Sequence, residues 1–489
     1  MSLLYEWLEA AVQGRTAAGG SGHAIVYHDT YLSWRGLLHR VERRARELVG
    51  MGIQGNDWVG LMLGNDPEFI VLTLALAKLG AVVVPIDPTT GSRDLDMTLE
   101  AVPLRAIVTR PNAVDPLAAP SGALRMAGQA PQPRIAAESR HRISGTLLTC
   151  SLYPWTPPAT EHGVPALVAL VTLDAGGDPK VVVRDAANLR GIAATLGAAL
   201  GLGPGENVLA AAPLFDCQGF DLGFLAALAH GATLFLDDGT AGPRLAKILV
   251  DQTIALYAAT PREFAALSRI THAKPIARPS ARLLCSGVPL PEAIARAFLR
   301  RFGVPALSCY QSCETGPAAI DLEGSSPDSV GKPLPGVEIR VASAAGAPLP
   351  DGSTGPVWAR GPGVASRFLP ALPARRGQIA VGRGRLDGWL RTGDVGRFDA
   401  DGRLHLSHRE DDLVSVDRKR VALGEIESCL ESRSEVKAAQ ALVEYDDSGS
   451  TQIVVRITPS GRCKANAMLD HCARRLAPYK VPRRIEIAD

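Results

Sequence analysis

The segment VTLDAGGDPKVVV, residues 171–183, contains the residue types that a phosphate-binding loop uses. The suitable residues are Thr172, Gly176, Gly177 and Lys180. A hydroxyl, an ammonium group and the backbone N–H groups of glycines can together surround phosphate oxygens. Asp174 lies in the same loop, and its carboxylate would repel a triphosphate. The loop therefore predicts a nucleotide site with weakened chemistry, and an ordinary turn is the alternative.

Helix and strand patterns alternate around this loop and must hold it in place. Residues 67–79 have the pattern of a buried helix, and the apolar runs WVGLML and GAVVVPID on either side of them indicate buried strands. The same alternation continues after the loop. This order predicts an α/β fold with largely parallel strands in its sheets.

The pattern of the chain changes in its last third. After about residue 325, short strands joined by Gly, Asp and Pro turns replace the alternation, and DADGRL is a hairpin signal. Beyond Asp411 the pattern is that of a small α+β unit. We therefore predict a large N-terminal lobe of several subdomains, residues 1–409, and a small C-terminal lobe, residues 410–489.

Composition and charge argue against several classes of protein. The 489 residues carry a net charge of +2 with both signs mixed, which argues against a nucleic-acid binder. The longest apolar run, residues 69–87, is interrupted by Lys78 and Gly80 and predicts no membrane span. The eight cysteines form no CxxC pair and the N-terminus lacks the features of a signal peptide, so we expect a reducing, cytoplasmic location.

The order of motifs along nearly the whole chain resembles that of the superfamily of adenylate-forming enzymes. Its members include acyl- and aryl-CoA synthetases, adenylation domains of nonribosomal peptide synthetases, and luciferases. Besides the phosphate loop, the resemblance rests on LLCSGVPL (283–290), YQSCETG (310–316), RTGDVGRF (391–398), VALGEIE (421–427) and LAPYKVPRRIEI (476–487). It implies that ATP and Mg²⁺ activate a small carboxylic acid as an acyl or aryl adenylate. Transfer of the acyl group to the thiol of CoA or of a carrier protein would follow.

The resemblance implies a catalytic centre beside the phosphate loop. Glu314 would hold Mg²⁺, which prefers one or two carboxylates plus the phosphates of a substrate. Thr172 and Lys180 would act on the phosphates as further catalytic residues. A solvated loop carboxylate is the alternative interpretation of Glu314. Asp411 lies at the family's hinge, about which the C-terminal lobe rotates between the two half-reactions.

The resemblance also implies a set of nucleotide-binding residues in addition to Gly176 and Gly177. Asp394 would accept hydrogen bonds from the ribose hydroxyls, and Arg409 would contact ribose or phosphate through its planar guanidinium. Tyr310 would stack on the adenine, whose edge the backbone of Ser286 and Gly287 would line. The alternatives are a turn aspartate, a surface arginine and a core tyrosine.

The segment PLFDCQGFD, residues 213–221, resembles the place where the acid pocket opens. The predicted substrate residues are Phe215, Asp216, Gly219, Gly287 and Cys313. Many acyl- and aryl-acid enzymes have a histidine at the position of Asp216, whereas amino-acid-activating domains have an aspartate that pairs with the α-amino group. A third interpretation is that Asp216 caps a helix over residues 218–229.

Three departures from the family pattern put adenylation in doubt. Leu173, Asp174 and Ala175 occupy loop positions where the family has hydroxyls and glycines. Arg418 stands where the family commonly has a glycine that approaches the pantetheine tunnel. The sequence ends at Asp489, before the segment that carries the family's terminal lysine, so we expect the C-terminal lobe to lack that lysine.

Two hypotheses therefore accompany that of an acid–thiol ligase that forms AMP. One is an amino-acid-activating adenylation domain. The other is a degenerate family member that binds a ligand or a partner without adenylating. A plain α/β binding protein is disfavoured by the motifs. Neither the acid, nor the choice between CoA and a carrier protein, nor the oligomeric state follows from the sequence.

Overall fold

A computed structural model describes residues 2–17, 22–90, 92–110, 139–152, 165–173, 179–237, 242–271, 274–287, 290–324, 326, 328–365, 367–369, 385–409, 413–416, 419–446, 451–461 and 463–487. Its helices are α1 (Leu3–Ala17), α2 (Trp34–Gly50), α3 (Pro67–Leu79), α4 (Ser92–Ala101), α5 (Ala186–Leu200), α6 (Cys217–Gly219), the π-helix η1 (Phe220–Leu225), α7 (Ala226–His230), α8 (Pro243–Asp251), α9 (Pro261–Ser268), α10 (Glu292–Phe302), α11 (Leu423–Glu431), α12 (Ala465–Arg475) and the 3₁₀-helix η3 (Pro478–Lys480).

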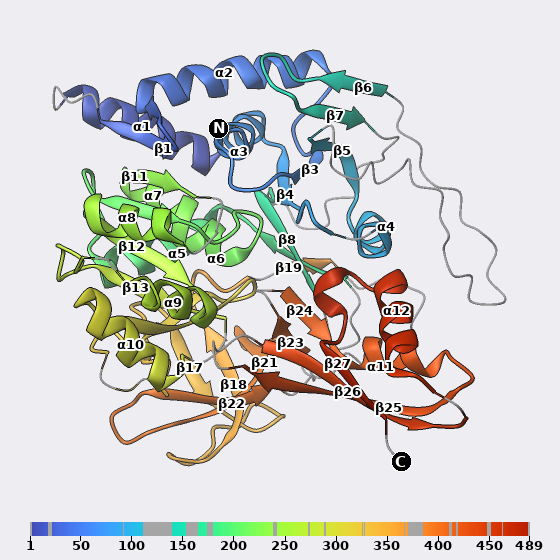
Figure 1. The fold of residues 1–489 in the computed structure, drawn as a ribbon. Coiled ribbons are helices and arrows are strands. Elements are labelled where there is room, and N and C mark those ends of the chain that lie inside the picture. The colour runs from blue at the N-terminus through green and yellow to red at the C-terminus, as the bar shows by residue number, and fades with distance from the viewer. Residues whose placement is uncertain are drawn as a thin grey trace.

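Two large sheets form most of the N-terminal lobe (Figure 1). One has the strand order β19-β9-β8-β4-β3-β5-β7-β6. Its strands are β3 (Trp58–Met62), β4 (Val82–Pro85), β5 (Leu104–Thr109), β6 (Ser139–Arg142), β7 (Thr149–Leu152), β8 (Val168–Leu173), β9 (Pro179–Arg184) and β19 (Arg367–Leu369). Strands β5, β3, β4 and β8 are parallel, as the helix–strand alternation predicts.

The second large sheet has the order β16-β15-β14-β13-β12-β10-β11-β1-β2. Its strands are β1 (His23–Tyr27), β2 (Thr30–Ser33), β10 (Asn207–Ala210), β11 (Thr233–Leu236), β12 (Ile254–Ala259), β13 (Arg282–Cys285), β14 (Ala306–Ser312), β15 (Gly316–Ile320) and β16 (Lys332–Pro333). From β1 to β14 the neighbouring strands are parallel. Loops at the carboxyl ends of these strands are therefore brought together on one edge of the sheet.

The remaining strands form smaller, mostly antiparallel sheets. A five-stranded sheet contains β17 (Glu338–Val341), β18 (Gly355–Arg360), β20 (Arg385–Leu386), β21 (Trp389–Phe398) and β22 (Leu404–Arg409). The C-terminal part contains the hairpin of β23 (Leu413–Val416) and β24 (Lys419–Ala422), and a sheet of β25 (Val436–Tyr445), β26 (Thr451–Pro459) and β27 (Arg484–Ile487). The DADGRL turn joins β21 to β22 as predicted, and a small α+β lobe follows. The boundary at residues 409–410 stays a prediction.

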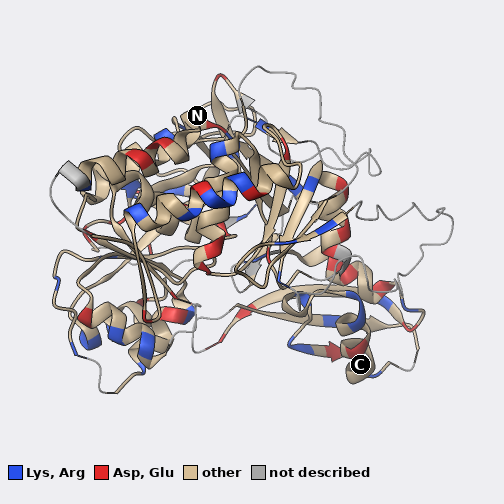
Figure 2. Ribbon diagram, turned by 90° about the horizontal axis from the view of Figure 1, so that it is seen from above, with Lys and Arg blue, Asp and Glu red and all other residues tan. Residues whose placement is uncertain are grey.

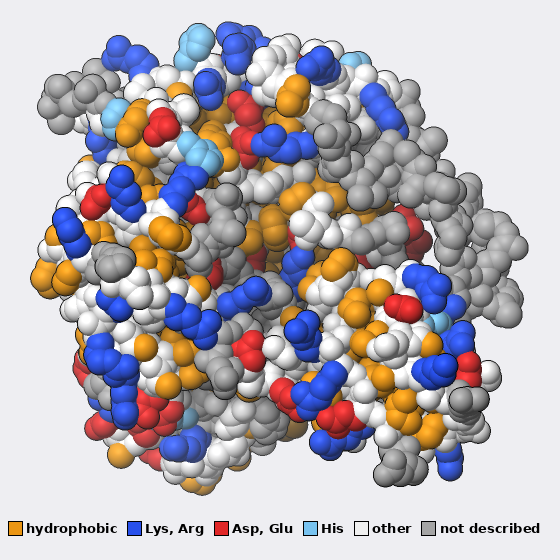
Figure 3. Space-filling model, in the orientation of Figure 1, with side chains coloured by type: hydrophobic (Ala, Val, Ile, Leu, Met, Phe, Trp, Pro, Cys, Tyr) orange, Lys and Arg blue, Asp and Glu red, His pale blue; other side chains and the backbone are white. Residues whose placement is uncertain are grey.

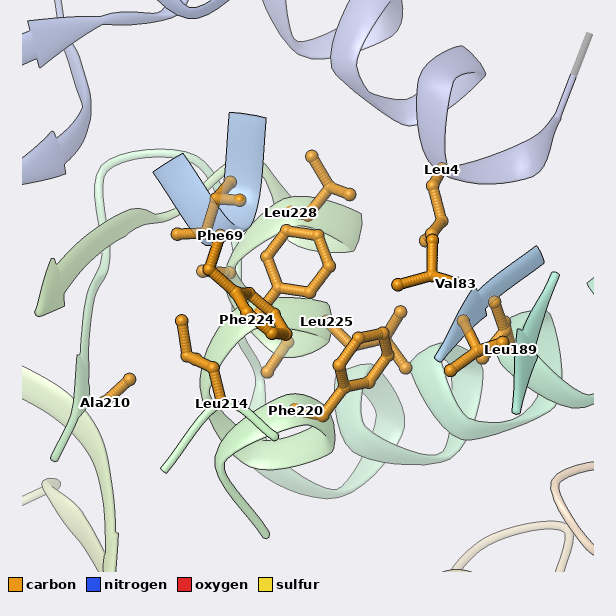
Figure 4. Packing of buried hydrophobic residues seen from close by; sticks show 14 of the residues in the cluster. Leu4, Phe69, Val83, Leu189, Ala210, Leu214, Phe220, Phe224, Leu225 and Leu228 are labelled. Atoms are coloured by element: carbon orange, nitrogen blue, oxygen red, sulfur yellow. The ribbon is translucent and has the colours of Figure 1, made fainter. Parts of the chain in front are cut away.

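The largest core cluster contains side chains from strands of both large sheets and from several helices (Figure 4). Phe220 and Phe224 of η1 pack among Leu189 of α5, Val83 of β4 and Leu4 of α1. The two phenylalanine rings lie 5.3 Å apart in an edge-to-face arrangement, which aromatic pairs favour. All five side chains are buried, so η1 is held from several sides.

Capping interactions determine where the helices next to the cavity begin. The Asp185 carboxylate accepts a hydrogen bond from the Asn188 backbone N–H at 3.0 Å, and the Asn188 side chain accepts one from the Asp185 N–H at 3.2 Å. This capping box starts α5 directly after β9. The end of β9, where Arg184 lies, is thereby held rigidly.

Charged residues lie mainly on the helices and loops at the periphery, while the central strands carry few (Figure 2). On the face shown in Figure 3, basic and acidic side chains are interspersed. This distribution agrees with the mixed charge along the sequence. Among the helices that the structure describes, none combines the length and the apolar character that crossing a bilayer requires.

A buried lysine ties the C-terminal lobe to the N-terminal lobe. The Lys480 ammonium is 1% exposed and lies 3.0 Å from Asp94 Oδ1 of α4 and 2.9 Å from Glu425 Oε2 of α11. The hydroxyl of Tyr479 donates to Asp94 Oδ2 at 3.2 Å. One carboxylate of α4 thus receives both contacts from the C-terminal lobe.

A second lysine contributes to the same junction. Lys419 of β24 forms an ion pair with Asp87 and donates to the Thr89 hydroxyl at 2.8 Å. Its ammonium also lies 4.3 Å from the centre of the Tyr479 ring, within the range of a cation–π contact. We refer to Asp87, Asp94, Lys419, Tyr479 and Lys480 as the lobe junction.

We expect Asp94→Ala to loosen the docking of the C-terminal lobe without unfolding it. The substitution removes the acceptor of Tyr479 and Lys480 on α4 but leaves Lys480 paired with Glu425 and Lys419 paired with Asp87. Charge-assisted hydrogen bonds contribute about 1.5–3 kcal/mol each. Small-angle scattering should show a larger radius of gyration. Glu100→Ala, at an exposed position of the same helix, is the control. Equal radii for the two variants would contradict the assignment.

Candidate active site

A cavity of about 560 Å³ lies at the carboxyl ends of the parallel strands, between the two lobes. Its wall includes residues that directly follow β4, β10 and β13, and residues of β23, β24 and β25 from the C-terminal lobe. Clefts at this edge of parallel sheets are the usual ligand sites of α/β proteins. The predicted site residues on its wall are Thr172, Phe215, Asp216, Ser286, Gly287, Tyr310, Cys313, Asp394 and Arg409.

The other predicted site residues do not line the cavity or are not described. Lys180 and Glu314 are buried and lie behind the wall that their neighbours Pro179 and Cys313 form. Gly219 is likewise absent from the wall. Gly176, Gly177 and the hinge residue Asp411 lie outside the described residues. The roles predicted for all of these residues stay predictions.

Asp394 receives two short hydrogen bonds, one on each carboxylate oxygen. The Tyr310 hydroxyl donates to its Oδ2 at 2.5 Å, and Arg409 Nη1 donates to its Oδ1 at 2.6 Å. Burial and the nearby carboxylate raise the pKa of Tyr310, so the phenol stays a hydrogen-bond donor. A carboxylate offers about four lone-pair sites, so Asp394 keeps capacity for further donors such as ribose hydroxyls.

Tyr310 therefore differs in part from its predicted environment. Its ring lines the cavity, as adenine stacking requires, but it is only 6% exposed and its hydroxyl is bound to Asp394. Tyr310 is thus a core tyrosine, which was the alternative interpretation, and it also lies on the cavity wall. It links β14 to β21, which carry the two motifs around Tyr310 and Asp394.

Lys180 and Glu314 form a buried ion pair. Lys180 Nζ lies 3.3 Å from Glu314 Oε1, and their side chains are 9% and 4% exposed. Lys180 stands opposite Thr172 on the paired strands β9 and β8, and its ammonium lies 4.2 Å from the centre of the Phe368 ring. The pair brings together two residues predicted to act on phosphate and metal.

A fully buried ion pair, which the sequence analysis did not identify, supports this centre. Arg184 Nη1 donates to Asp221 Oδ1 at 2.6 Å, and both side chains are 0% exposed. Arg184 also donates to the carbonyl of Cys313 from Nη2 at 2.7 Å and from Nε at 3.2 Å. The single charge of Asp221 in the apolar run FDLGFLAALA was a signal of a buried partner.

The Ser286–Gly287 turn follows β13 as the resemblance implies. The Ser286 N–H donates to the carbonyl of Ala259 at 3.0 Å, which continues the pairing of β12 with β13 by one residue. Gly287 has φ = +95°, a conformation that other residues adopt only with strain. The turn therefore exposes backbone on the cavity wall, where the predicted contact with the base would lie.

The predicted acid segment starts with a helix cap. The Asp216 carboxylate accepts a hydrogen bond from the Gln218 N–H at 3.3 Å and is the N-cap of α6. A Cβ at Gly219 would lie 2.2 Å from the Pro213 carbonyl oxygen, so this glycine allows close packing rather than contact with a ligand. The predicted continuous helix over 218–229 is instead interrupted by the π-helix η1, a feature frequent at functional sites.

Comparison with known proteins identifies the family. A family model described as AMP-binding enzyme matches residues 14–369. The chain belongs to this family. The predicted membership among adenylate-forming enzymes is thereby confirmed, and so is the prediction of an enzyme that forms AMP.

Curated relatives cover nearly the whole chain. Feruloyl-CoA synthase of an Amycolatopsis species is 25% identical over 474 residues, which cover 95% of this chain and 92% of the relative. Sulfoacetate–CoA ligase of Cupriavidus necator is 28% identical over 476 residues, covering 95% and 88%. A linear gramicidin synthase of Brevibacillus parabrevis is 27% identical over 478 residues, covering 94% of this chain and 6% of that protein.

Solved structures agree with the fold. The amide bond synthetase McbA from Marinactinospora thermotolerans superimposes with a TM-score of 0.78 at 22% identity, covering 100% of this chain and 96% of that one. The o-succinylbenzoate CoA synthetase MenE from Bacillus subtilis, as a double mutant, also gives 0.78, at 21% identity with 99% and 94% covered. The predicted α/β fold with a large and a small lobe is confirmed.

The described residues offer several groups for a nucleotide but only one carboxylate for a metal ion. Asp394, Arg409 and Thr172 place acceptors and donors on the cavity wall, which suits a ribose and phosphates. No group of three or more His, Cys, Asp or Glu side chains in the described part of the chain could hold a metal by itself. Glu314 alone suits Mg²⁺, because substrate phosphates can supply the other oxygens.

We expect Asp221→Asn to lower the free energy of unfolding by about 3–5 kcal/mol, because it leaves Arg184 as a buried charge without a counter-ion. Urea unfolding measures the loss. Glu338→Gln is the control, since Glu338 and its partner Arg360 are 58% and 43% exposed and exposed ion pairs contribute little to stability. A loss at Asp221 as small as that at Glu338 would refute the structural role.

Proposed function

We propose that this AMP-binding enzyme activates a carboxylic acid with ATP and Mg²⁺ and transfers the acyl group to the thiol of CoA or of a carrier protein. The observation that carries the proposal is the Tyr310–Asp394–Arg409 group on the cavity wall. The buried Lys180–Glu314 pair lies behind the wall that Pro179 and Cys313 form. An acceptor that suits a ribose and a pair of charges that suits a triphosphate and a metal ion support the proposal.

Each residue of the site has a task that its geometry allows. Asp394 accepts the ribose hydroxyls, while Tyr310 and Arg409 hold its carboxylate in place. When bound, Mg²⁺ neutralises phosphate charge, and Glu314 is the carboxylate that would hold it. Lys180, then released from Glu314, is free to face the phosphates. Positioning and charge neutralisation supply most of the catalysis that such a transfer needs.

Several relatives are named for the reaction proposed here. Feruloyl-CoA synthase and sulfoacetate–CoA ligase join acids to CoA, and each aligns with 95% of this chain. The gramicidin synthase supports the carrier-protein form of the acceptor. The predicted cofactors, ATP and Mg²⁺, agree with the family and with a fold neighbour solved with ATP bound.

The two alternative functions are less favoured. The Asp216 carboxylate accepts the N-cap hydrogen bond of α6. The α-amino group of an amino-acid substrate would have to share that carboxylate with the helix. Of the departures in the phosphate loop, Asp174 and Ala175 lie outside the described residues, whereas Leu173 ends β8 on the cavity wall. The degenerate alternative is therefore left to experiment. Pyrophosphate exchange that depends on an added acid separates the ligase from that alternative.

The division at residues 409–410 and the hinge at Asp411 belong to the same proposal. Lobe rotation about this point would break the lobe junction and re-form it between half-reactions. A cytoplasmic location fits an enzyme that uses ATP and CoA and whose cysteines are all free thiols.

We expect Asp394→Ala to weaken ATP binding by about 1.5–3 kcal/mol, or roughly ten- to a hundredfold, because charge-assisted acceptors for ribose are lost. Isothermal titration with ATP and Mg²⁺ measures the affinity. Asp401→Ala is the control, since Asp401 is 68% exposed in the turn between β21 and β22. An unchanged affinity in Asp394→Ala would show that the nucleotide does not bind in this part of the cavity.

A second variant tests the phosphate loop. We expect Asp174→Gly combined with Ala175→Thr to strengthen ATP binding by about 1 kcal/mol, since it removes a negative charge near the triphosphate and restores a hydroxyl. ATP titration and pyrophosphate exchange on the parent and the double variant measure the change. Lower turnover in the variant would mean that Asp174 serves a specialised role.

A further inference from the structure

The exposed side of helix α2 carries a row of basic side chains. Four exposed residues form this row, and they are Arg35, His39, Arg43 and Arg46. Their spacing of four, four and three residues brings these side chains onto one side of an α-helix. The helix runs along the upper edge of the molecule in Figure 1, and blue and pale blue side chains lie along that edge in Figure 3. We call these four residues the basic face.

No acidic partner neutralises the three arginines of the basic face. Within the ranges that the structure describes, no carboxylate lies at ion-pair distance from any of them. The helix has two acidic residues of its own, and each is already paired with another cation: Glu42 with Lys78 and Glu47 with the buried Arg44. The positive charge of the basic face is therefore available to an anionic surface outside the protein.

Exposed apolar side chains lie beside the basic face. The described part of the chain exposes six large hydrophobic side chains, and three of them belong to α2 or to segments next to it: Tyr31, Val49 and Leu147. Tyr31 of β2 lies two residues before the N-cap of the helix, and Val49 lies in its last turn. Single exposed apolar residues are ordinary on protein surfaces. Half of the exposed set beside one basic helix distinguishes this surface from one that is only solvated.

The turn between β6 and β7 extends this surface. Its residue Ser144 is bonded to α2 twice, because its N–H donates to Glu47 Oε1 at 2.6 Å and its carbonyl accepts from Arg44 Nη1 at 3.2 Å. Leu147 in the same turn is 61% exposed, and Arg142 at the end of β6 is exposed as well. The turn therefore adds one apolar and one basic side chain next to the helix.

An anionic lipid bilayer has the chemistry that this combination recognises. Basic side chains on a helix are attracted to lipid phosphates, and apolar side chains beside them can enter the boundary between headgroups and acyl chains. Nucleic acid offers phosphates but no apolar phase for Val49 and Leu147. An acidic carrier protein would have to bring its thiol to the cavity, and no residue of α2 lines the cavity.

From these observations we propose that the basic face, together with Val49 and Leu147, binds the surface of a membrane that contains anionic phospholipids. Helix α2 then lies along the bilayer, with its arginines at the level of the phosphates. Anionic phospholipids are typical of the cytoplasmic leaflet, which agrees with the location proposed above. No residue of the basic face belongs to the candidate active site, so this inference is independent of the proposed function.

Sedimentation with lipid vesicles tests the proposal on the full chain. We compare vesicles of pure phosphatidylcholine with vesicles of equal parts phosphatidylcholine and phosphatidylglycerol. The protein should sediment with the anionic vesicles and stay in solution with the neutral ones. Raising the salt concentration should release it from the anionic vesicles, because salt screens interactions between exposed charges.

A double substitution connects vesicle binding to the basic face. Arg43→Gln combined with Arg46→Gln should lower the partition coefficient by about tenfold or more, since each basic residue near an anionic surface contributes roughly fivefold. Thermal unfolding checks that the variant is folded. The matched control is Arg269→Gln combined with Arg300→Gln, at exposed positions after α9 and in α10. Helix α10 lies on the opposite side of the molecule from α2, so the control should bind as the parent does (Figure 1).

A single substitution tests the apolar part of the surface. Leu147→Ser should lower the partition coefficient by about threefold or more, because it removes an apolar side chain that leaves water on binding. Leu299→Ser is the control, since Leu299 of α10 is 46% exposed on the other side of the molecule. Equal partition of these two variants would overturn the apolar contact with the bilayer.

The remaining outcomes decide the proposal as a whole. Equal binding to neutral and anionic vesicles, or equal partition of the two double variants, overturns it. Size-exclusion chromatography with an acidic acyl carrier protein examines the other class of partner. A complex that the Arg43 and Arg46 substitutions abolish, without any vesicle binding, overturns the membrane assignment. Since neither acid nor nucleotide is added, these results stand apart from those of pyrophosphate exchange.

Discussion

A pair of opposite charges with no access to solvent, Arg184 and Asp221, constrains the arrangement of the whole cavity. Taking two charges out of water costs several kcal/mol per ion, so the pair persists only where its geometry and further hydrogen bonds compensate. Arg184 ends β9, Asp221 lies in η1, and Arg184 also donates to the carbonyl of Cys313. Three segments that are distant in the sequence are thereby held together: the strand β9, the π-helix η1, and the loop that carries Glu314.

The same requirement explains the arrangement of the nucleotide side of the cavity. Asp394 is neutralised by Arg409 and bonded by Tyr310, while Glu314 is paired with Lys180. These groups need partners before any ligand arrives, because an isolated buried charge is far more costly than a paired one. In the proposed function, ribose hydroxyls are added to an Asp394 carboxylate that Tyr310 and Arg409 already hold, whereas Glu314 exchanges Lys180 for Mg²⁺. Asp394 is therefore the pre-organised part of the proposed site, as catalysis by positioning requires.

The sequence predicted the fold and the cavity wall better than it predicted the supports behind them. Helix–strand alternation depends on local periodicity, so the parallel sheets and helix 67–79 could be predicted from short windows. Tyr310, Asp394 and Arg409 belong to motifs in a fixed order, and the structure brings them into contact. Asp216 was open to three interpretations, and the structure shows the helix cap among them.

Long-range partners could not be predicted in this way. Arg184 and Asp221 are 37 residues apart and Lys480 lies 386 residues after Asp94, so no local pattern relates them. Each is a single charge in a stretch that is otherwise ordinary, and its partner is determined only by tertiary packing. Propensity carries no information on such contacts.

Pairing of the charges also limits how the site can change in evolution. Asp394 and Arg409 hold one another, and so do Glu314 and Lys180, so a change in any one of these residues leaves a partner unpaired. Such a change costs stability whatever it does to activity. These four residues are therefore constrained by the fold as well as by the reaction that we propose for them.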